Sequence, residues 1–258
     1  IFSPILAGSL YPIIGLQGII LIDLGTFLVA FVILLASDIP SPSPDDSEAT
    51  APLVDWSNLT FGLRYIFSQP GLLALVLAFS CFALPSDIGR ALYNPMILAR
   101  SGGDAQVLGA VTTAAGIGGV LGALLVSWKG GFKGRIHGML LGFAGTGFCK
   151  IGLGLGQTAW VWIPAHFAAT LLIPLYYSSS NAIWYAKVPP PLQGRVLAAD
   201  QMMGLGIGAI APLLAGPLAD FVFEPAMQPG GRLAPIFGPL LGTGAGAGMA
   251  LLYTLMAV

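Results

Sequence analysis

The sequence predicts an all-α, polytopic membrane protein. Three observations predict this class: 56% of the 258 residues are hydrophobic, only 8% are charged, and the mean hydropathy is +0.86. A soluble domain carries about 25% charged residues, whereas apolar stretches of about 18 residues or more are typical of membrane-spanning helices. The composition excludes a soluble globular enzyme, a disordered chain and a nucleic-acid binder, because a net charge of −1 provides no basic surface for phosphates.

Two apolar segments begin the chain. Residues 1–15 form a segment too short to be a full span, and they include two prolines and two glycines. We therefore interpret them as the end of a truncated span. Residues 17–37 are long enough to cross a hydrocarbon core of about 30 Å. Their one charge, Asp23, either caps the start of this helix, where an anion suits the helix dipole, or serves transport. Because the chain starts at Ile1 and lacks signal-peptide features, we expect a fragment whose N-terminal part is missing.

The composition changes sharply after residue 37. Residues 38–52 are acidic and rich in Pro and Ser, which indicates a solvated linker. Residues 55–69 then place apolar side chains at helical spacing, and this pattern predicts an amphipathic helix on the membrane surface. Both segments fall in a predicted linker over residues 38–70. The apolar positions of the helix are Trp56, Leu59, Leu63, Ile66 and Phe67.

Six further spans form a predicted bundle over residues 71–258. Residues 151–186 carry no formal charge and would extend about 54 Å as one helix, nearly twice the bilayer core, so the chain must turn. The glycines and polar pair of GLGLGQT (152–158) are the natural position for this turn. The six predicted spans are residues 71–98, 105–128, 136–155, 159–185, 196–219 and 234–257.

Basic residues predict the orientation of these spans. Of the ten Lys and Arg residues, six lie in alternate connections on one side, two lie on the other side and two lie inside spans. The positive-inside rule then places the linker 38–70, the loops 128–137 and 186–195, and the C-terminus in the cytoplasm. The protein is thus expected in the inner or plasma membrane. The six are Arg64, Lys129, Lys133, Arg135, Lys187 and Arg195; the two are Arg100 and Arg232.

Three motifs carry a family resemblance. Residues 128–138 read WKGGFKGRIHG, residues 188–200 read VPPPLQGRVLAAD, and residues 213–225 read LLAGPLADFVFEP. With six helices after a long linker, they resemble the C-terminal half of a major facilitator superfamily transporter. The second motif resembles drug-exporter-like members, and within that group the third resembles the macrolide-efflux and enterobactin-exporter branch. The resemblance implies that residues 1–37 are the last one to two helices of the N-terminal half. The usual Asp of the first motif is missing here, with Gly131 near its place.

Charged residues inside spans are candidates for function, because each costs about 2.5–3.5 kcal/mol at a helix centre. Asp87 and Arg90 are three residues apart and share a helix face. Pro85 and Gly89 interrupt the same helix, and the polar Asn94 follows. We expect a substrate- or proton-coupling pair that faces a central cavity. The alternative is an intrahelical ion pair near the outer surface.

Other polar residues within spans have two interpretations each. Lys150 either meets an anionic substrate or a carboxylate, or it extends to the nearby membrane surface. His166 is a candidate for proton coupling, because histidine titrates near physiological pH; the alternative is a hydrogen-bonded structural histidine. The polar run from Tyr176 to Asn181 either lines a wet cavity or bonds a neighbouring helix.

The cytoplasmic loops supply candidates for gating. Lys129, Lys133 and Arg135 belong to the first loop, and Arg195 precedes the 196–219 helix. We expect Asp200 in the first turn or two of that helix, where it stabilises the N-terminus or pairs with the first loop.

The 36 glycines include small-xxx-small pairs that predict close helix packing. The run GTGAGAG (242–248) is not a nucleotide-binding loop, because no strand precedes it. The pairs are Gly118/Gly122, Gly152/Gly156, Gly204/Gly208 and Gly244/Gly248.

The leading functional hypothesis is a secondary transporter that exports a hydrophobic or amphipathic small molecule by proton-coupled alternating access. The sequence has no Walker motif, nucleophile–base pair or metal-ligand spacing, so we expect no enzyme activity, no cofactor and no metal. The expected partners are a small-molecule or lipid-like substrate, the bilayer and the missing N-terminal half, but no nucleic acid. Two alternatives are a lysophospholipid flippase of the same superfamily and a non-transporting membrane scaffold.

Overall fold

The computed structural model describes residues 3–37, 56–131 and 134–257, and these residues form helices with no β-strand among them. The chain divides into two compact units, residues 1–55 and 56–258. Five helical segments of the described chain are long and apolar enough to span a membrane. The structure therefore confirms the predicted all-α membrane fold. The predicted solvated linker 38–52 lies outside the described residues.

The first unit contains α1 (Ser3–Ala36), which is broken at Gly15. Gly15 has φ 65° and ψ −177°, a conformation that glycine adopts without the steric cost of a side chain. This break confirms that two apolar segments meet between residues 15 and 17. Asp23 lies eight residues after the break, inside the helix. The expectation that it caps a helix start is therefore wrong.

The second unit opens with α2 (Trp56–Ser68), the predicted amphipathic helix. It packs mainly on α8 and also contacts α3. Its Ile66 is fully buried, and Gly62 approaches the backbone of Arg195 so closely that a Cβ would not fit. The helix thus contributes to the packed core of this unit. Its position on a membrane surface stays a prediction.

The next three helices agree with the predicted spans: α3 (Pro70–Arg100), α4 (Ala105–Lys129) and α5 (Arg135–Leu155). Pro70 begins α3, where its missing N–H costs nothing. Asp104 caps α4, and its Oδ1 accepts from the Gln106 N–H at 2.8 Å. Gly130 ends α4 in the left-handed conformation, with φ 70°.

The following two spans are bent. The fourth consists of α6 (Ala159–Leu171) and α7 (Ile173–Lys187), which meet at Leu172, two residues before a proline that lacks the N–H of a continuous helix. The fifth runs from α8 (Pro190–Pro217) through a π-helical turn (Leu218–Phe223) into α9 (Glu224–Met227). The wide turn follows Pro217, because proline disturbs regular α-helical bonding. α8 begins six residues before the predicted start at residue 196.

The prediction of one continuous helix over residues 234–257 is wrong. This segment forms two short helices, α10 (Ala234–Leu241) and α11 (Ala247–Leu255), and the glycine-rich residues 242–246 break it. Gly242, Gly244 and Gly246 all have positive φ, which ordinary residues rarely adopt. Gly244/Gly248 is therefore not a helical pair. The last described residue, Ala257, lies beside Gly147, near the middle of α5. The segment after residue 247 therefore runs along only part of α5.

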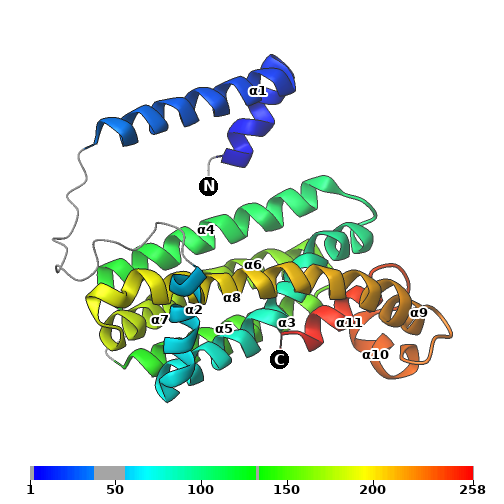
Figure 1. Ribbon diagram of the computed structural model, residues 1–258. Coiled ribbons are helices and arrows are strands. Elements are labelled where there is room, and N and C mark those ends of the chain that lie inside the picture. Colours follow the sequence, from blue (N-terminus) through cyan, green and yellow to red (C-terminus); the bar gives the residue numbers. More distant parts are fainter. Residues whose placement is uncertain (1–2, 38–55, 132–133, 258) are drawn as a thin grey trace. The chain divides into compact units, whose positions relative to one another are not determined.

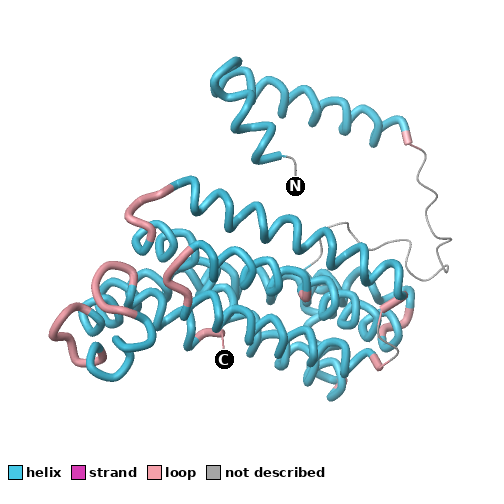
Figure 2. The backbone as a smooth tube through the Cα atoms, turned by 180° about the vertical axis from the view of Figure 1, so that it is seen from behind, coloured by secondary structure: helices cyan, strands magenta, loops and turns pink. Residues whose placement is uncertain are grey.

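The long helices of the second unit run side by side (Figures 1 and 2). The most extensive packing joins α4 to α6, α3 to α8, and α5 to both α6 and α7. Of the predicted glycine pairs, Gly118/Gly122 fits close helix packing, because added Cβ atoms would collide with the α6 backbone. Gly204, by contrast, has open space where a Cβ would be.

Candidate functional site

An ion pair lies near the middle of α3. Nη2 of Arg90 is 3.2 Å from Oδ1 of Asp87; the Arg90 side chain is 75% exposed and that of Asp87 is 23% exposed. The second carboxylate oxygen, Oδ2, faces Gly208 of α8, where a Cβ would lie 3.7 Å away. The carboxylate therefore lies between α3 and α8, whereas the guanidinium extends to the surface of this unit.

Lys150 of α5 adjoins this pair. Its Nζ donates a hydrogen bond to Oγ of Ser86, the residue before Asp87, and lies 5.7 Å from the centre of the Phe82 ring. No carboxylate oxygen of the described residues lies within 4.0 Å of this ammonium. The structure thus gathers one carboxylate and two cations from α3 and α5. We name Asp87, Arg90 and Lys150 the charged cluster.

A second polar group includes Tyr93, six residues after Asp87 on α3. The hydroxyl of Tyr93 and Oγ1 of Thr112, on α4, are 3.2 Å apart. The ring of His166, on α6, lies 4.5 Å from the Tyr93 ring, centre to centre. Nδ1 of His166 is buried and has no hydrogen-bond partner within the described part of the chain. Tyr93 thus links His166 to the same helix that carries Asp87.

Tyr176 belongs to an aromatic cluster rather than to a polar surface. It is only 6% exposed, and its ring centre lies 4.9 Å from that of Phe143 and 5.3 Å from that of Phe82. Phe82 and Phe143 stack at 4.1 Å, and Phe79 meets Phe143 edge-on. Because Lys150 lies over Phe82, this aromatic cluster adjoins the charged cluster.

The remaining polar residues of the spans are scattered. Ser179 and Ser180 are buried, at 4% exposure each, whereas Asn181 is exposed on α7. Asn94 is likewise exposed on α3. The polar run 176–181 therefore faces several directions and forms no single surface.

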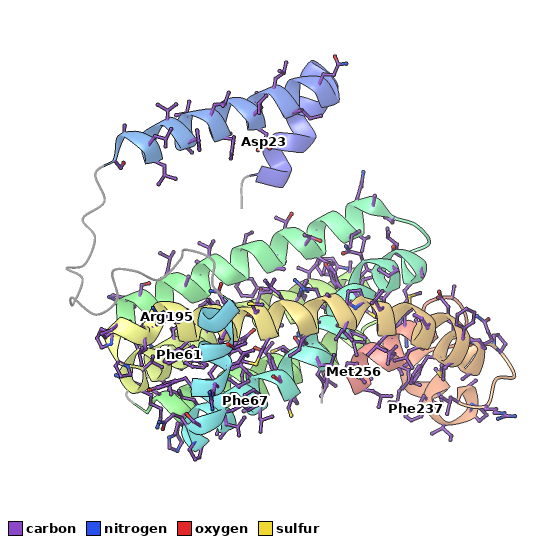
Figure 3. All side chains as sticks on the ribbon, in the orientation of Figure 1. Asp23, Phe61, Phe67, Arg195, Phe237 and Met256 are labelled. Carbon is purple, nitrogen blue, oxygen red and sulfur yellow. The ribbon has the colours of Figure 1, made fainter. Side chains whose placement is uncertain are left out.

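The gating candidates lie near helix ends. Lys129 is exposed at the end of α4, and Lys133 lies outside the described residues. Nη1 of Arg135 donates to the Ala182 carbonyl of α7 at 2.7 Å. The Arg195 guanidinium lies 5.8 Å from the centre of the Phe61 ring of α2 (Figure 3). Asp200 lies ten residues after the start of α8, too far to bond its first turn.

Sequence reasoning missed two charged residues that hold helix ends. Arg100 donates to the Gly154 carbonyl at 3.0 Å and to the Leu241 carbonyl. The carboxylate of Glu224 accepts from the Met249 N–H at 2.9 Å and from the Gly246 N–H at 3.3 Å. The sequence does show a charge at the edge of each of two apolar segments. It does not show the bonding partners, which for Arg100 lie 54 residues or more away along the chain.

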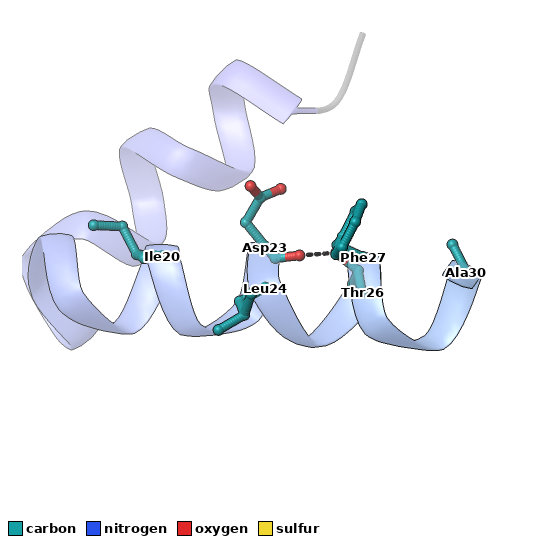
Figure 4. A pocket seen from close by; sticks show the side chains of 6 residues that line it. All are labelled: Ile20, Asp23, Leu24, Thr26, Phe27 and Ala30. Carbon is teal, nitrogen blue, oxygen red and sulfur yellow. Dashed lines mark hydrogen bonds between the residues drawn. The ribbon is translucent and has the colours of Figure 1, made fainter. Parts of the chain in front are cut away.

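Two of the pockets in the described residues bear on the candidate sites. The first, in the first unit, is lined by Asp23 and five neighbours that all belong to α1 (Figure 4). It is therefore the surface of one helix, with no described side chain opposite. The second lies between the start of α5 and the end of α7, and its lining includes Arg135, His137 and Lys187. Neither pocket contains the charged cluster.

Comparison with known families identifies the architecture. The model of the Major Facilitator Superfamily matches residues 1–212, from α1 almost to the end of α8. The chain belongs to the major facilitator superfamily. No curated protein and no solved structure matches it.

Membership of the superfamily makes this chain a secondary transporter and a multi-pass integral membrane protein. Members of the superfamily bind small-molecule substrates within a lipid bilayer, and they are transporters rather than enzymes. The charged cluster consequently lies on two helices of a transporter, α3 and α5, that are long and apolar enough to span a membrane, and charges within such spans are costly.

Proposed function

We propose that this transporter exports a hydrophobic or amphipathic small molecule by proton-coupled alternating access, and that Asp87 is the coupling carboxylate. The observation that carries the proposal is the charged cluster near the middle of α3, where Asp87 adjoins both Arg90 and Lys150. The resemblance of residues 188–200 to drug-exporter-like members, and of residues 213–225 to the macrolide-efflux and enterobactin-exporter branch, supports export as the direction of transport.

The exposure of Arg90 supports a polar cavity beside α3. A charge in contact with hydrocarbon costs about 2.5–3.5 kcal/mol at a helix centre, and Arg90 is 75% exposed on this unit. A water-lined or substrate-lined cavity removes that cost. In transporters of this type the substrate site lies near the bilayer midplane, between two sets of helices.

Protonation of Asp87 supplies a physical mechanism for coupling. The charged cluster carries a net charge of +1 when Asp87 is ionised, because one carboxylate opposes two cations; with Asp87 protonated the net charge is +2. Protonation therefore weakens the Asp87–Arg90 ion pair and frees the guanidinium. The adjoining aromatic cluster offers contact area for an apolar cargo.

The proposal includes the domain organisation. Residues 1–37 are the last helices of an N-terminal bundle, residues 38–70 are a cytoplasmic linker, and residues 71–258 belong to the C-terminal bundle. The family match across residues 1–212 supports one transporter that includes both units.

The test is transport by the full-length protein in liposomes with an imposed pH gradient. A fluorescent hydrophobic cation and a labelled lysophospholipid are followed in parallel. We expect Asp87→Asn to reduce gradient-driven movement of the dye at least tenfold. The matched control is Asp104→Asn, which neutralises an exposed carboxylate just before α4, where asparagine also caps a helix, and it should leave the rate unchanged.

Three outcomes would overturn the proposal. Equal dye movement by both variants would remove Asp87 from coupling. Movement of lysophospholipid alone would favour the flippase. An absence of movement of either probe, with the protein folded, would favour the scaffold.

A further inference from the structure

The pocket between α5 and α7 is distinct from the charged cluster. It has a volume of about 390 Å³, and its lining joins the first turn of α5 to the last turns of α7. Three of its seven lining residues are basic types, and none is acidic: Arg135, His137 and Lys187. It therefore has the charge to bind an anion.

The basic side chains of the pocket have no ionic partner within the part of the chain that the structure describes. No carboxylate among the described residues lies within 4.0 Å of Arg135, His137 or Lys187. Arg135 does bond the Ala182 carbonyl, but this bond uses one of the five N–H donors of its guanidinium. The bond also fixes the guanidinium beside α7, so the pocket has a positioned cation and not only mobile surface charges.

The backbone at the start of α5 adds donors to the same pocket. Gly134 is the N-cap residue and has no side chain to bond the first turn. The first N–H groups of a helix lack intrahelical partners and carry a partial positive charge. Because Gly134 and Arg135 both line the pocket, the helix N-terminus and a basic side chain border one volume.

The surroundings favour a lipid over a soluble anion. Ile136 lines the pocket and is 61% exposed, and Leu140, one turn further along α5, is 53% exposed. These side chains form an apolar strip that leads from the basic pocket along a membrane-spanning helix. Tyr185, near the C-terminal end of α7, is 58% exposed, and Trp128, near the C-terminal end of α4, is 83% exposed. Exposed aromatic rings of this kind are typical of the membrane interface.

We propose that this pocket binds an anionic phospholipid, with the phosphate on Arg135 and Lys187 and an acyl chain along Ile136 and Leu140. Basic pockets between spanning helices bind anionic headgroups, and each Lys or Arg near the membrane surface contributes about 1 kcal/mol to the attraction of anionic lipids. This site goes beyond the proposed function, because it requires neither a cargo nor a proton gradient.

Lipid binding to the full-length protein in detergent tests the proposal. Native mass spectrometry measures the lipid-bound fraction during titration with phosphatidylglycerol, or with phosphatidylcholine of the same chain length. We expect phosphatidylglycerol to bind at least fivefold more tightly. Lys187→Gln should weaken its binding about fivefold, the equivalent of about 1 kcal/mol, and Arg135→Gln at least as much. The matched control is Arg64→Gln, which removes an exposed charge of α2 outside the pocket and should have no effect.

The design separates a failed site from a misfolded variant. Arg135→Gln also removes the bond to α7, so its thermal unfolding is measured in parallel, and Lys187→Gln alone decides the result if Arg135→Gln is unstable. Equal binding of the two lipids, or equal effects of Lys187→Gln and Arg64→Gln, would overturn the proposal. Displacement of the lipid by an equimolar amount of glycerol 1-phosphate would overturn it as well, because the site would then prefer the free anion.

Discussion

Arg100 and Glu224 hold the ends of interrupted helices at one end of the second unit. Arg100 donates to carbonyls at the ends of α5 and α10, and Glu224 accepts from N–H groups at the start of α11. Each charge has the sign that the helix dipole favours at its position. These two residues therefore satisfy backbone groups that the break at residues 242–246 leaves unbonded.

We predict that Glu224→Gln destabilises the protein by about 1–3 kcal/mol, the cost of leaving a buried polar group unsatisfied. Glutamine retains one acceptor oxygen, and its amide NH2 cannot accept a bond from the Gly246 or Met249 N–H. Thermal unfolding in detergent, followed by circular dichroism, measures this change as a lower midpoint temperature. Asp220→Asn is the control, because Asp220 is exposed nearby and should leave the midpoint unchanged. Equal midpoints for the wild-type protein and Glu224→Gln would contradict a role in holding α11.

At the scale of elements, the closest packing of long helices involves α4 and α6. Gly118 lies against Phe167 and Thr170 of α6, and Gly122 lies against the backbone of Leu171. Because backbone atoms cannot move aside as a flexible side chain does, a methyl group at either position forces the two helices apart.

We predict that Gly122→Ala destabilises the protein by about 1–3 kcal/mol through overpacking. Gly116→Ala, on the same helix, should leave stability unchanged or raise it by up to about 1 kcal/mol, because nothing lies within 4 Å of a Cβ there and alanine favours helix. The two substitutions are chemically identical, so the sign of their difference tests the contact with α6. Midpoint temperatures in detergent measure it, and a stabilised Gly122→Ala variant would contradict the observed packing.

Most elements could be predicted from the sequence, because membrane-spanning length and apolar composition act locally. The break at Gly242–Gly246 was missed, since the segment 234–257 is apolar enough for one helix and glycine is common in spans. The ion pair of Asp87 and Arg90 follows from spacing on one helix. The bond of Lys150 to Ser86 joins residues 64 positions apart, and no periodicity within one segment predicts which helices meet.

At the scale of the whole molecule, the superfamily match unites the two units in one transporter. Most of the basic residues fall in alternate connections of the predicted spans, and such an asymmetry sets the orientation of a membrane protein. The predicted topology puts six basic residues on the side of the 128–137 loop and two on the opposite side. In that topology the proposed phospholipid pocket, which includes Arg135 and Lys187, lies on the more basic side, where anionic lipids of the cytoplasmic leaflet would reach it.

We predict that the connection after α9 is extracellular or periplasmic and that the connection after α4 is cytoplasmic. Gln228→Cys and Lys129→Cys place a single thiol in each exposed connection, in a background in which every native cysteine of the full-length protein, Cys81 and Cys149 included, is replaced by serine. A membrane-impermeant maleimide added to intact cells should label Gln228→Cys at once, and Lys129→Cys only after permeabilisation. Labelling both thiols after permeabilisation verifies that each is reactive. The reverse pattern would invert the orientation and place the phospholipid pocket in the other leaflet. Immediate labelling of both would contradict an odd number of crossings between the two positions, and with it the assignment of α5, α6–α7 and α8–α9 as three separate spans.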